Sequence, residues 1–193
     1  EGASAKPAEI FQNAIIIESP ALQNTKAYMD GLFHVQDISS QFCAAALGAK
    51  PGDRVLDVCA APGGKTFTVA EIMENRGEVV ACDLHAKRAK LVKTGGERLG
   101  LGIITARAND ATVYDESFGK FDKVLCDVPC SGLGVIRRKP EIRFKKPEDL
   151  QSLPKIQYRI AAASSKYLKE GGVLVYSTCT LSRDENENVV KQL

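Results

Sequence analysis

The sequence lacks several features that would assign it to a class of protein at once. No apolar run approaches the roughly 18 residues that a membrane-spanning helix needs. The first ten residues, EGASAKPAEI, do not place an apolar stretch after a basic one, as a secretory signal does. No CxxC pair exists and only two histidines are present, so no metal site is expected. The net charge of +2 is too small to indicate a partner.

Six cysteines are present in the 193 residues. The chain is long enough, and its 44% hydrophobic content ordinary enough, to form a core without disulfides, so we expect free thiols and a reducing, cytoplasmic compartment. Cys59, Cys82 and Cys126 each lie in or beside an apolar strand-like run. These three are expected to be small buried hydrophobic residues.

Short apolar runs alternate with helical patterns along most of the chain. Each run is about five residues long and almost continuously apolar, as in parallel strands that are covered on both faces. The predicted strands are Arg54–Cys59, Glu78–Asp83, Gly102–Ala106, Lys123–Asp127 and Val173–Thr178. The predicted helices are Lys65–Glu74, Ala86–Leu99, Ile156–Lys169 and one that begins near Asp184. Left-handed helix caps are expected at Gly77, Gly100 and Gly171-Gly172. The alternation predicts a doubly wound, Rossmann-like α/β domain with a mostly parallel sheet.

The first 48 residues follow a different pattern. Ala14–Glu18 resembles a strand, and Ile38–Leu47 a helix with Asp37 as its N-cap. We expect residues 1–48 to form a lead-in packed on the α/β domain, which would comprise residues 49–193.

A glycine-rich turn joins the first predicted strand of the domain to its helix. The string VLDVCAAPGGKT, Val55 to Thr66, has small residues that would let a ligand approach the backbone at a helix N-terminus. Its end matches a phosphate-binding P-loop, but Cys59 occupies the first glycine position, and no GxGxxG is present. The turn is therefore not a complete phosphate-binding loop. It could still bind a nucleoside cofactor that carries no phosphate, such as S-adenosylmethionine.

Acidic residues follow the next two predicted strands. Asp83 ends the second strand, where an acid commonly binds ribose hydroxyls, although an isolated Asp there is often a helix cap. Asn109-Asp110 follows the third strand and could contact adenine, although such pairs are also common in turns.

Two cysteines follow the last two predicted strands. The fourth strand ends in Asp127-Val128-Pro129-Cys130, and the fifth in Ser177-Thr178-Cys179. Because these strands are neighbours in a doubly wound sheet, both thiols are expected beside the cofactor crevice.

Methyl transfer to cytosine C5 is a reaction that needs such thiols. C5 is a weak nucleophile until a thiolate adds at C6 and pushes electron density onto it. Lys65 could favour the thiolate, and Asp127 could pair with the cytosine edge.

At these residues the sequence resembles the RsmB/Sun (NOL1/NOP2/Sun) family of RNA (cytosine-5)-methyltransferases. The matching strings are FHVQDISSQ, LDVCAAPGGKT, Asp83, Asn109-Asp110, DVPCSGLGVIRRKPEIR and YSTCTLSRDENE, which span Phe33 to Glu187. The resemblance implies a class I S-adenosylmethionine-dependent methyltransferase with Cys179 as nucleophile and Cys130 assisting product release. The implied catalytic set also contains Asp127 and Lys65. The expected cofactor-binding set is Cys59, Ala60, Ala61, Pro62, Gly63, Gly64, Lys65, Asp83, Arg88, Asp110 and Asp127.

A basic segment follows the Pro-Cys loop. Residues 137–146 contain six basic side chains and one acid. At the active edge this charge favours contact with RNA phosphates, although a charge run is often only a solvated face. The expected RNA-binding residues are Arg137, Arg138, Lys139 and Arg143.

The sequence thus predicts transfer of a methyl group from S-adenosylmethionine to C5 of cytosine in RNA, with ribosomal 16S-type RNA as the expected partner. A P-loop-like nucleotide hydrolase and a non-catalytic RNA-binding module are the alternatives. The missing initiator Met suggests a fragment or a processed chain. Compared with the family, the N-terminal helical RNA-binding domain is absent, and we expect truncation at the C-terminal edge of the sheet.

Overall fold

A five-stranded parallel sheet forms the centre of the computed structural model, which describes residues 4–11, 13–18 and 21–193. The strand order is β5-β4-β3-β6-β7, so the chain enters the sheet at its middle strand and then adds strands on both sides of it. The strands are β3 (Arg54–Asp57), β4 (Glu78–Asp83), β5 (Ile104–Ala108), β6 (Phe121–Asp127) and β7 (Leu168–Ser177). The predicted doubly wound, Rossmann-like fold is confirmed.

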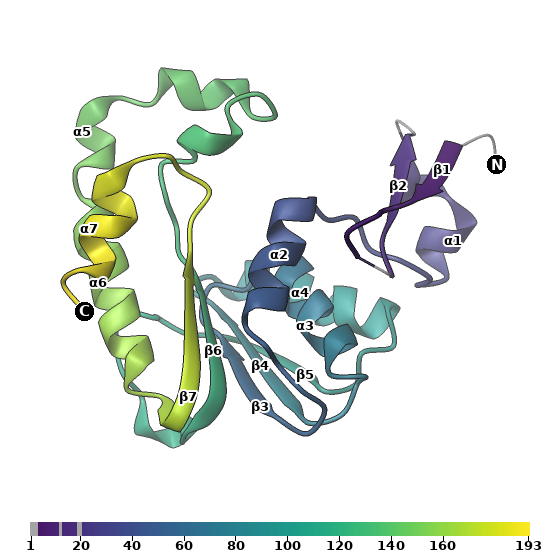
Figure 1. Ribbon diagram of the computed structural model, residues 1–193, viewed down its shortest axis with the longest axis horizontal. Helices are drawn as coiled ribbons and strands as arrows, with labels where there is room; N and C mark the ends of the chain where they lie inside the picture. The colour runs from purple at the N-terminus through teal and green to yellow at the C-terminus, as the bar shows by residue number, and fades with distance from the viewer. Residues whose placement is uncertain (1–3, 12, 19–20) are drawn as a thin grey trace.

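Helices cover both faces of this sheet (Figure 1). One face packs on α2 (Ile38–Ala46), α3 (Gly64–Ile72) and α4 (Ala86–Arg98), and the other on α6 (Leu153–Ser165). Each face has its own core: Val55 and Leu125 belong to the first cluster, and Leu56 and Val124 to the second. The near-continuous apolar runs follow from this, because successive strand residues point to opposite faces that are both buried.

The N-terminal segment places one helix on the domain and extends a hairpin beyond it (Figure 1). β1 (Ser4–Pro7) and β2 (Ile15–Glu18) pair antiparallel, and the 3-10 helix η1 (Leu22–Asn24) and α1 (Lys26–Met29) lead to α2. The Asp37 carboxylate accepts a hydrogen bond from Ser39 N at 2.9 Å, which confirms the expected N-cap. Ala44 and Leu47 are fully buried in the core below α3. The domain boundary at residue 48 stays a prediction.

Short helices complete the C-terminal half. They are η2 (Glu116–Phe118), η3 (Leu133–Val135), η4 (Pro140–Phe144), α5 (Pro147–Leu150), η5 (Arg183–Glu185) and α7 (Glu187–Val190). The helix predicted to begin near Asp184 is thus present as two short helices, η5 and α7. The helix breaks at Asn186, whose side-chain amide donates to the carbonyls of Thr180 and Ser182 and holds the residue out of helical geometry.

The boundary between α6 and β7 also differs from the prediction. The predicted helix Ile156–Lys169 ends at Ser165, because the next residues join the sheet: Tyr167 accepts a hydrogen bond from Phe121 N, and Leu168 pairs with Phe121. Gly171-Gly172 consequently lies inside β7, where the register with β6 shifts, and is no helix cap.

The other two predicted caps have different outcomes. Gly100 follows the end of α4 with φ of +69°, as expected. Gly77 is not the cap of α3, because that helix ends at Ile72 and the left-handed residues that follow are Glu74 and Asn75. The Asn75 amide donates to the Gly100 carbonyl at 3.1 Å, which holds this turn in place without a glycine.

No helix in the described part of the chain is long and apolar enough to cross a membrane. Within residues 4–11, 13–18 and 21–193, no group of three or more His, Cys, Asp or Glu side chains is arranged to hold a metal ion.

Candidate active site

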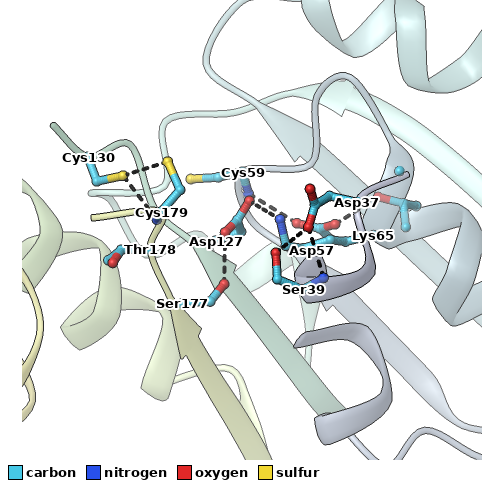
Figure 2. A network of polar contacts seen from close by, with 12 residues as sticks. Asp37, Ser39, Asp57, Cys59, Lys65, Asp127, Cys130, Ser177, Thr178 and Cys179 are labelled. Carbon is cyan, nitrogen blue, oxygen red and sulfur yellow. Dashed lines mark hydrogen bonds and ion pairs between the residues drawn. The ribbon is translucent and has the colours of Figure 1, made fainter. Parts of the chain in front are cut away.

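The two thiols predicted to share the sheet edge are in contact. Cys130 follows β6, Cys179 follows β7, and their Sγ atoms are 3.2 Å apart (Figure 2). The backbone N–H of Cys179 also donates to Cys130 Sγ at 3.2 Å. Cys179 is exposed, whereas Cys130 is half-buried. The Cys179 sulfur is therefore accessible from solvent, and the less exposed Cys130 sulfur is in contact with it.

Backbone hydrogen bonds join the two loops that hold these cysteines. Val128 N donates to Ser177 O at 3.1 Å, and Gly134 N donates to Cys179 O at 3.0 Å. A β-carbon on Gly134 would lie 2.9 Å from the Cys179 carbonyl oxygen, so only glycine allows this approach. The loops therefore continue the pairing of β6 and β7 past the end of the sheet.

The surroundings of the thiols favour a thiolate on Cys179. The hydrogen bond from the Cys130 thiol lowers the pKa of Cys179 to about 6, against the effects of burial and of the Asp127 carboxylate. Lys139 and Lys65 add positive charge that acts in the same direction as the hydrogen bond. The pKa of Cys130 is raised, because its proton is held in the hydrogen bond to Cys179. The shifts in pKa therefore favour the thiolate on the exposed Cys179 sulfur and the proton on the half-buried Cys130 sulfur.

Alkylation of Cys179 by iodoacetamide is expected to rise with pH around a midpoint of about 6, because the lowered pKa populates the reactive thiolate above that pH. In Cys130→Ala the midpoint should move up toward about 8.5, the value of a thiol without a partner. The measurement is the alkylation rate of the Cys179 peptide by mass spectrometry between pH 5 and 10. Coincident profiles for the two proteins would contradict the assigned hydrogen bond.

Lys65 and Asp127 form an ion pair beside the thiols. Lys65 Nζ donates to Asp127 Oδ2 at 2.6 Å, and the Ser177 hydroxyl donates to Asp127 Oδ1 at 2.8 Å. Burial disfavours the charged lysine, but the Asp127 carboxylate outweighs it and raises the pKa of Lys65. Both oxygens of Asp127 are thereby fixed in orientation at the end of β6.

Asp57 is a buried carboxyl group that the sequence analysis did not single out, although it ends the strand before the glycine-rich turn. Burial raises its pKa to about 7; the hydrogen bond from the Thr66 hydroxyl opposes this rise, and the Asp127 carboxylate adds to it. The Thr66 hydroxyl donates to Asp57 at 2.7 Å and is fully buried. The Thr66 hydroxyl is therefore bonded to Asp57 in the protein interior and is not available to a ligand on the glycine-rich turn.

A cavity of about 640 Å³ opens between the glycine-rich turn, α2 and the two cysteine loops. Seven residues predicted to bind cofactor line it: Cys59, Ala60, Ala61, Pro62, Gly64, Lys65 and Asp127. Cys179 lies at its wall, together with residues of α2 that the sequence analysis did not propose: Ser39, Ser40 and Cys43. The turn is bent at Gly63, where φ is +117° and a β-carbon would lie 2.3 Å from the Phe67 ring.

Four predicted cofactor residues do not line this cavity. They are Gly63, Asp83, Arg88 and Asp110, all within the described part of the chain. Asp110 is exposed and accepts hydrogen bonds from the side chain and backbone of Thr112, which lower its pKa. The structure therefore gives Asp110 a turn contact, and its role toward a cofactor stays a prediction.

Asp83 has partners of its own at the end of β4. Its Oδ1 accepts a hydrogen bond from His85 N at 3.0 Å, and its Oδ2 lies 3.4 Å from Arg88 Nη2. Arg88 also donates to the carbonyl oxygen of Ala61 at 2.9 Å. Asp83 therefore both caps the turn before α4 and orients an arginine that holds the glycine-rich turn.

Replacing Asp83 by Ala is expected to weaken S-adenosylmethionine binding more than tenfold. The variant would lose the predicted hydrogen bonds from the ribose hydroxyls to the Asp83 carboxylate, and hydrogen bonds that involve a charged group contribute roughly 1.5–3 kcal/mol. Asp83→Asn keeps an oxygen for His85 N and should bind with intermediate affinity. Titration calorimetry gives both dissociation constants. An unchanged constant in Asp83→Ala, with a lowered melting temperature, would mean that the residue is only a cap.

The basic segment lies beside the cavity, and its members differ in their contacts. Arg138 and Lys139 line the cavity, whereas Arg137 and Arg143 are exposed outside it. Arg138 forms an ion pair with Asp37 at the N-terminus of α2. The segment thus places the positive charges of Arg138 and Lys139 on the wall of the cavity.

Two of the three cysteines expected to be buried are buried, and the third is not. Cys82 and Cys126 are fully buried, as predicted. Cys59 is only half-buried and lines the cavity, because the chain has already left the sheet at this position. All six cysteines are free thiols.

Comparison with known proteins places this site in a family. Residues 44–193 match the family described as 16S rRNA methyltransferase RsmB/F. The chain is 43% identical over 193 residues to the "Probable ribosomal RNA small subunit methyltransferase B" of Bacillus subtilis, covering 98% of this chain and 43% of that protein. It is 39% identical to the ribosomal RNA small subunit methyltransferase B of Proteus mirabilis, covering 98% of this chain and 46% of that protein. The chain spans less than half the length of these relatives.

Solved structures share the fold. NSun6 from Pyrococcus horikoshii, whose crystal structure was determined with SFG, is 37% identical with a TM-score of 0.83, covering 91% of this chain and 45% of that chain. A methyltransferase homolog protein from the same organism is 31% identical with a TM-score of 0.82, covering 99% and 61%. The two adjoining thiols and the glycine-rich turn therefore lie in a chain that belongs to the 16S rRNA methyltransferase RsmB/F family.

Proposed function

We propose that this chain is the catalytic part of an enzyme that transfers a methyl group from S-adenosylmethionine to C5 of cytosine in RNA. The observation that carries the proposal is the contact of Cys130 with Cys179, which lines the same cavity as the glycine-rich turn. A single thiol would serve many reactions, but two thiols of unlike protonation suit addition to a base followed by release from it.

The residues present divide the reaction between them. The Cys179 thiolate forms a bond to C6, which makes C5 nucleophilic, and C5 then takes the methyl group. The C5 proton must next be removed, so that the electron pair of that C–H bond restores the C5–C6 double bond and the Cys179 sulfur leaves as a thiolate. After giving up its own proton to water, the Cys130 sulfur, at 3.2 Å from the Cys179 sulfur, can accept the C5 proton and so assist the release. Asp127, with both oxygens fixed, is placed to accept a hydrogen bond from the cytosine edge.

The cavity fits the methyl donor. Its volume of about 640 Å³ is within the range of small-molecule sites. The first residues of α3, Gly64 and Lys65, line this space, and the N–H groups at the start of a helix have no partner within it, which suits a carboxylate. S-adenosylmethionine supplies the electrophilic methyl group, and the chain's own residues orient it. The proposed cofactor contacts remain Cys59 through Lys65, Asp83, Arg88, Asp110 and Asp127.

Ribosomal RNA is the proposed substrate, since the relatives are named for the small-subunit RNA. The basic segment supports an RNA partner, because phosphates require positive charge near the reacting base. A cytoplasmic location suits the mechanism, which needs reduced thiols.

The nucleotide-hydrolase alternative conflicts with the geometry. A P-loop threonine must bind a magnesium ion, whereas Thr66 donates its hydroxyl to Asp57 and is fully buried. A non-catalytic RNA-binding module does not account for an exposed thiol whose pKa is lowered to about 6.

Titration calorimetry and a methylation assay test the proposal together. The chain should bind S-adenosylmethionine and not magnesium-ATP. The full-length protein should transfer labelled methyl groups to unmodified small-subunit RNA, with the product mapped to 5-methylcytosine by mass spectrometry. Tight magnesium-ATP binding without methyl-donor binding would refute it.

A further inference from the structure

A buried cluster of polar side chains lies behind the two cysteine loops. It consists of Ser131, Gln157, Thr180 and Glu185, each less than one-tenth exposed. Ser131 and Thr180 directly follow Cys130 and Cys179, Gln157 comes from α6, and Glu185 from η5. The mechanism described above uses none of these side chains.

Glu185 is the acceptor at the centre of this cluster. Its Oε2 accepts hydrogen bonds from Ser131 N at 2.8 Å and from Gln157 Nε2 at 2.9 Å. The same Gln157 amide donates to Pro129 O at 2.9 Å, so it ties the carboxylate to the residue before Cys130 as well. On the other loop, the Thr180 hydroxyl donates to Glu185 Oε1 at 3.4 Å.

The two loops also contact each other through this cluster. The hydroxyls of Ser131 and Thr180 are 2.6 Å apart, and Tyr176 donates its hydroxyl to the backbone carbonyl of Glu185 at 2.7 Å. The carboxylate thus binds the residue after Cys130 and the residue after Cys179 directly, and the residue before Cys130 through Gln157. A buried charge is costly unless its acceptor sites are filled, and here three donors fill them.

We propose that Glu185 is a positioning residue, which holds the Cys130 and Cys179 thiols in contact by binding the residue that follows each of them. The inference rests on the proposed function, in which that contact produces the nucleophile. It assigns Glu185 no contact with substrate, cofactor or the reacting atoms.

The sign of the effect on Cys179 separates positioning from simple electrostatics. A nearby negative charge disfavours a thiolate, so neutralising Glu185 would by charge alone lower the pKa of Cys179. Loss of positioning would instead separate the sulfurs, weaken the hydrogen bond from Cys130 and raise that pKa. The two accounts predict opposite shifts.

The test is the pH profile of Cys179 alkylation, read from its peptide by mass spectrometry. In Glu185→Ala the midpoint should rise by at least about one unit toward the 8.5 of a free thiol, and the rate at pH 6.5 should fall at least about threefold. Glu185→Gln keeps an oxygen for Ser131 N and Gln157 and presents its NH2 to the Thr180 hydroxyl, so it should retain the parent midpoint. Glu187→Ala removes an exposed acid two residues later and is the matched control.

Each outcome decides the matter. An unchanged midpoint in a folded Glu185→Ala protein, or a lowered midpoint in both Glu185 variants, would overturn the proposal. If Glu185→Ala does not fold, Thr180→Val removes the Cys179 side of the cluster alone and should raise the midpoint in the same direction; an unchanged value would again refute the proposal.

Alkylation needs neither methyl donor nor RNA, so its result stands apart from that of the methylation assay. In the full-length protein, Glu185→Ala should lower kcat without changing the dissociation constant for S-adenosylmethionine.

Discussion

Cys179→Ala in the full-length protein is expected to abolish methyl transfer to RNA and to form no covalent adduct. The exposed Cys179 sulfur is the one whose surroundings favour the thiolate, and without it C5 is not activated. Cys130→Ala keeps the nucleophile but loses the thiol 3.2 Å behind it. It should methylate the base and then remain attached to RNA.

The two variants are compared on a denaturing gel, where a protein–RNA adduct migrates slowly. The assay is run above pH 8.5, because the loss of Cys130 also raises the pKa of Cys179 and would slow attack near neutrality. The Cys130→Ala band should require the methyl donor, and Cys179→Ala should give none. An adduct on Cys179→Ala alone would reverse the roles of the two cysteines. Full activity in both variants would end the covalent mechanism.

Replacing Arg137, Arg138 and Lys139 together by Ala is expected to weaken RNA binding and flatten its salt dependence. Each lost phosphate contact on a single strand should reduce the slope of log affinity against log salt by about 0.7, so three contacts amount to about 2. Arg138 pairs with Asp37 in the absence of RNA, so its contribution includes the cost of leaving that partner. Fluorescence anisotropy at several salt concentrations measures the slope.

The matched control replaces Lys87, Lys90 and Lys93 by Ala. These exposed lysines lie on α4, away from the cavity, and their loss changes the net charge equally. An equal drop in slope for both triple variants would mean that only overall charge matters. An unchanged slope in the first variant would make the basic segment a solvated face.

The sheet and its active edge could be predicted because local patterns determine them. The apolar run Glu78–Asp83 is β4 to the residue, and the strand ends at Asp127 and near Cys179 bring the thiols to one edge of the sheet. The start of β7 could not be predicted in this way. Leu168 continues the helical pattern of α6, and only its pairing with Phe121, 47 residues earlier, places it in the sheet.

The contacts that tune the site join residues too distant in sequence for a local pattern to reveal. Lys65 was expected to act on the thiolate, yet its direct partner is Asp127, 62 residues away. Arg138 was expected to meet phosphate, and in this structure it pairs with Asp37. Burial of Glu185 was equally hidden, since its neighbours Asp184 and Glu187 are exposed and its own string, SRDENE, is strongly polar.

The close approach at Gly134 sets a limit on how this site can vary. A single added methyl group at that position would clash with the Cys179 carbonyl oxygen, so any larger residue at position 134 would displace the backbone of Cys179. Every replacement of Gly134 should therefore act as an active-site mutation, although the residue has no side chain and carries no chemistry. The position of the Cys179 sulfur thus depends in part on Gly134, whose α-carbon carries a hydrogen atom where every other residue carries a side chain.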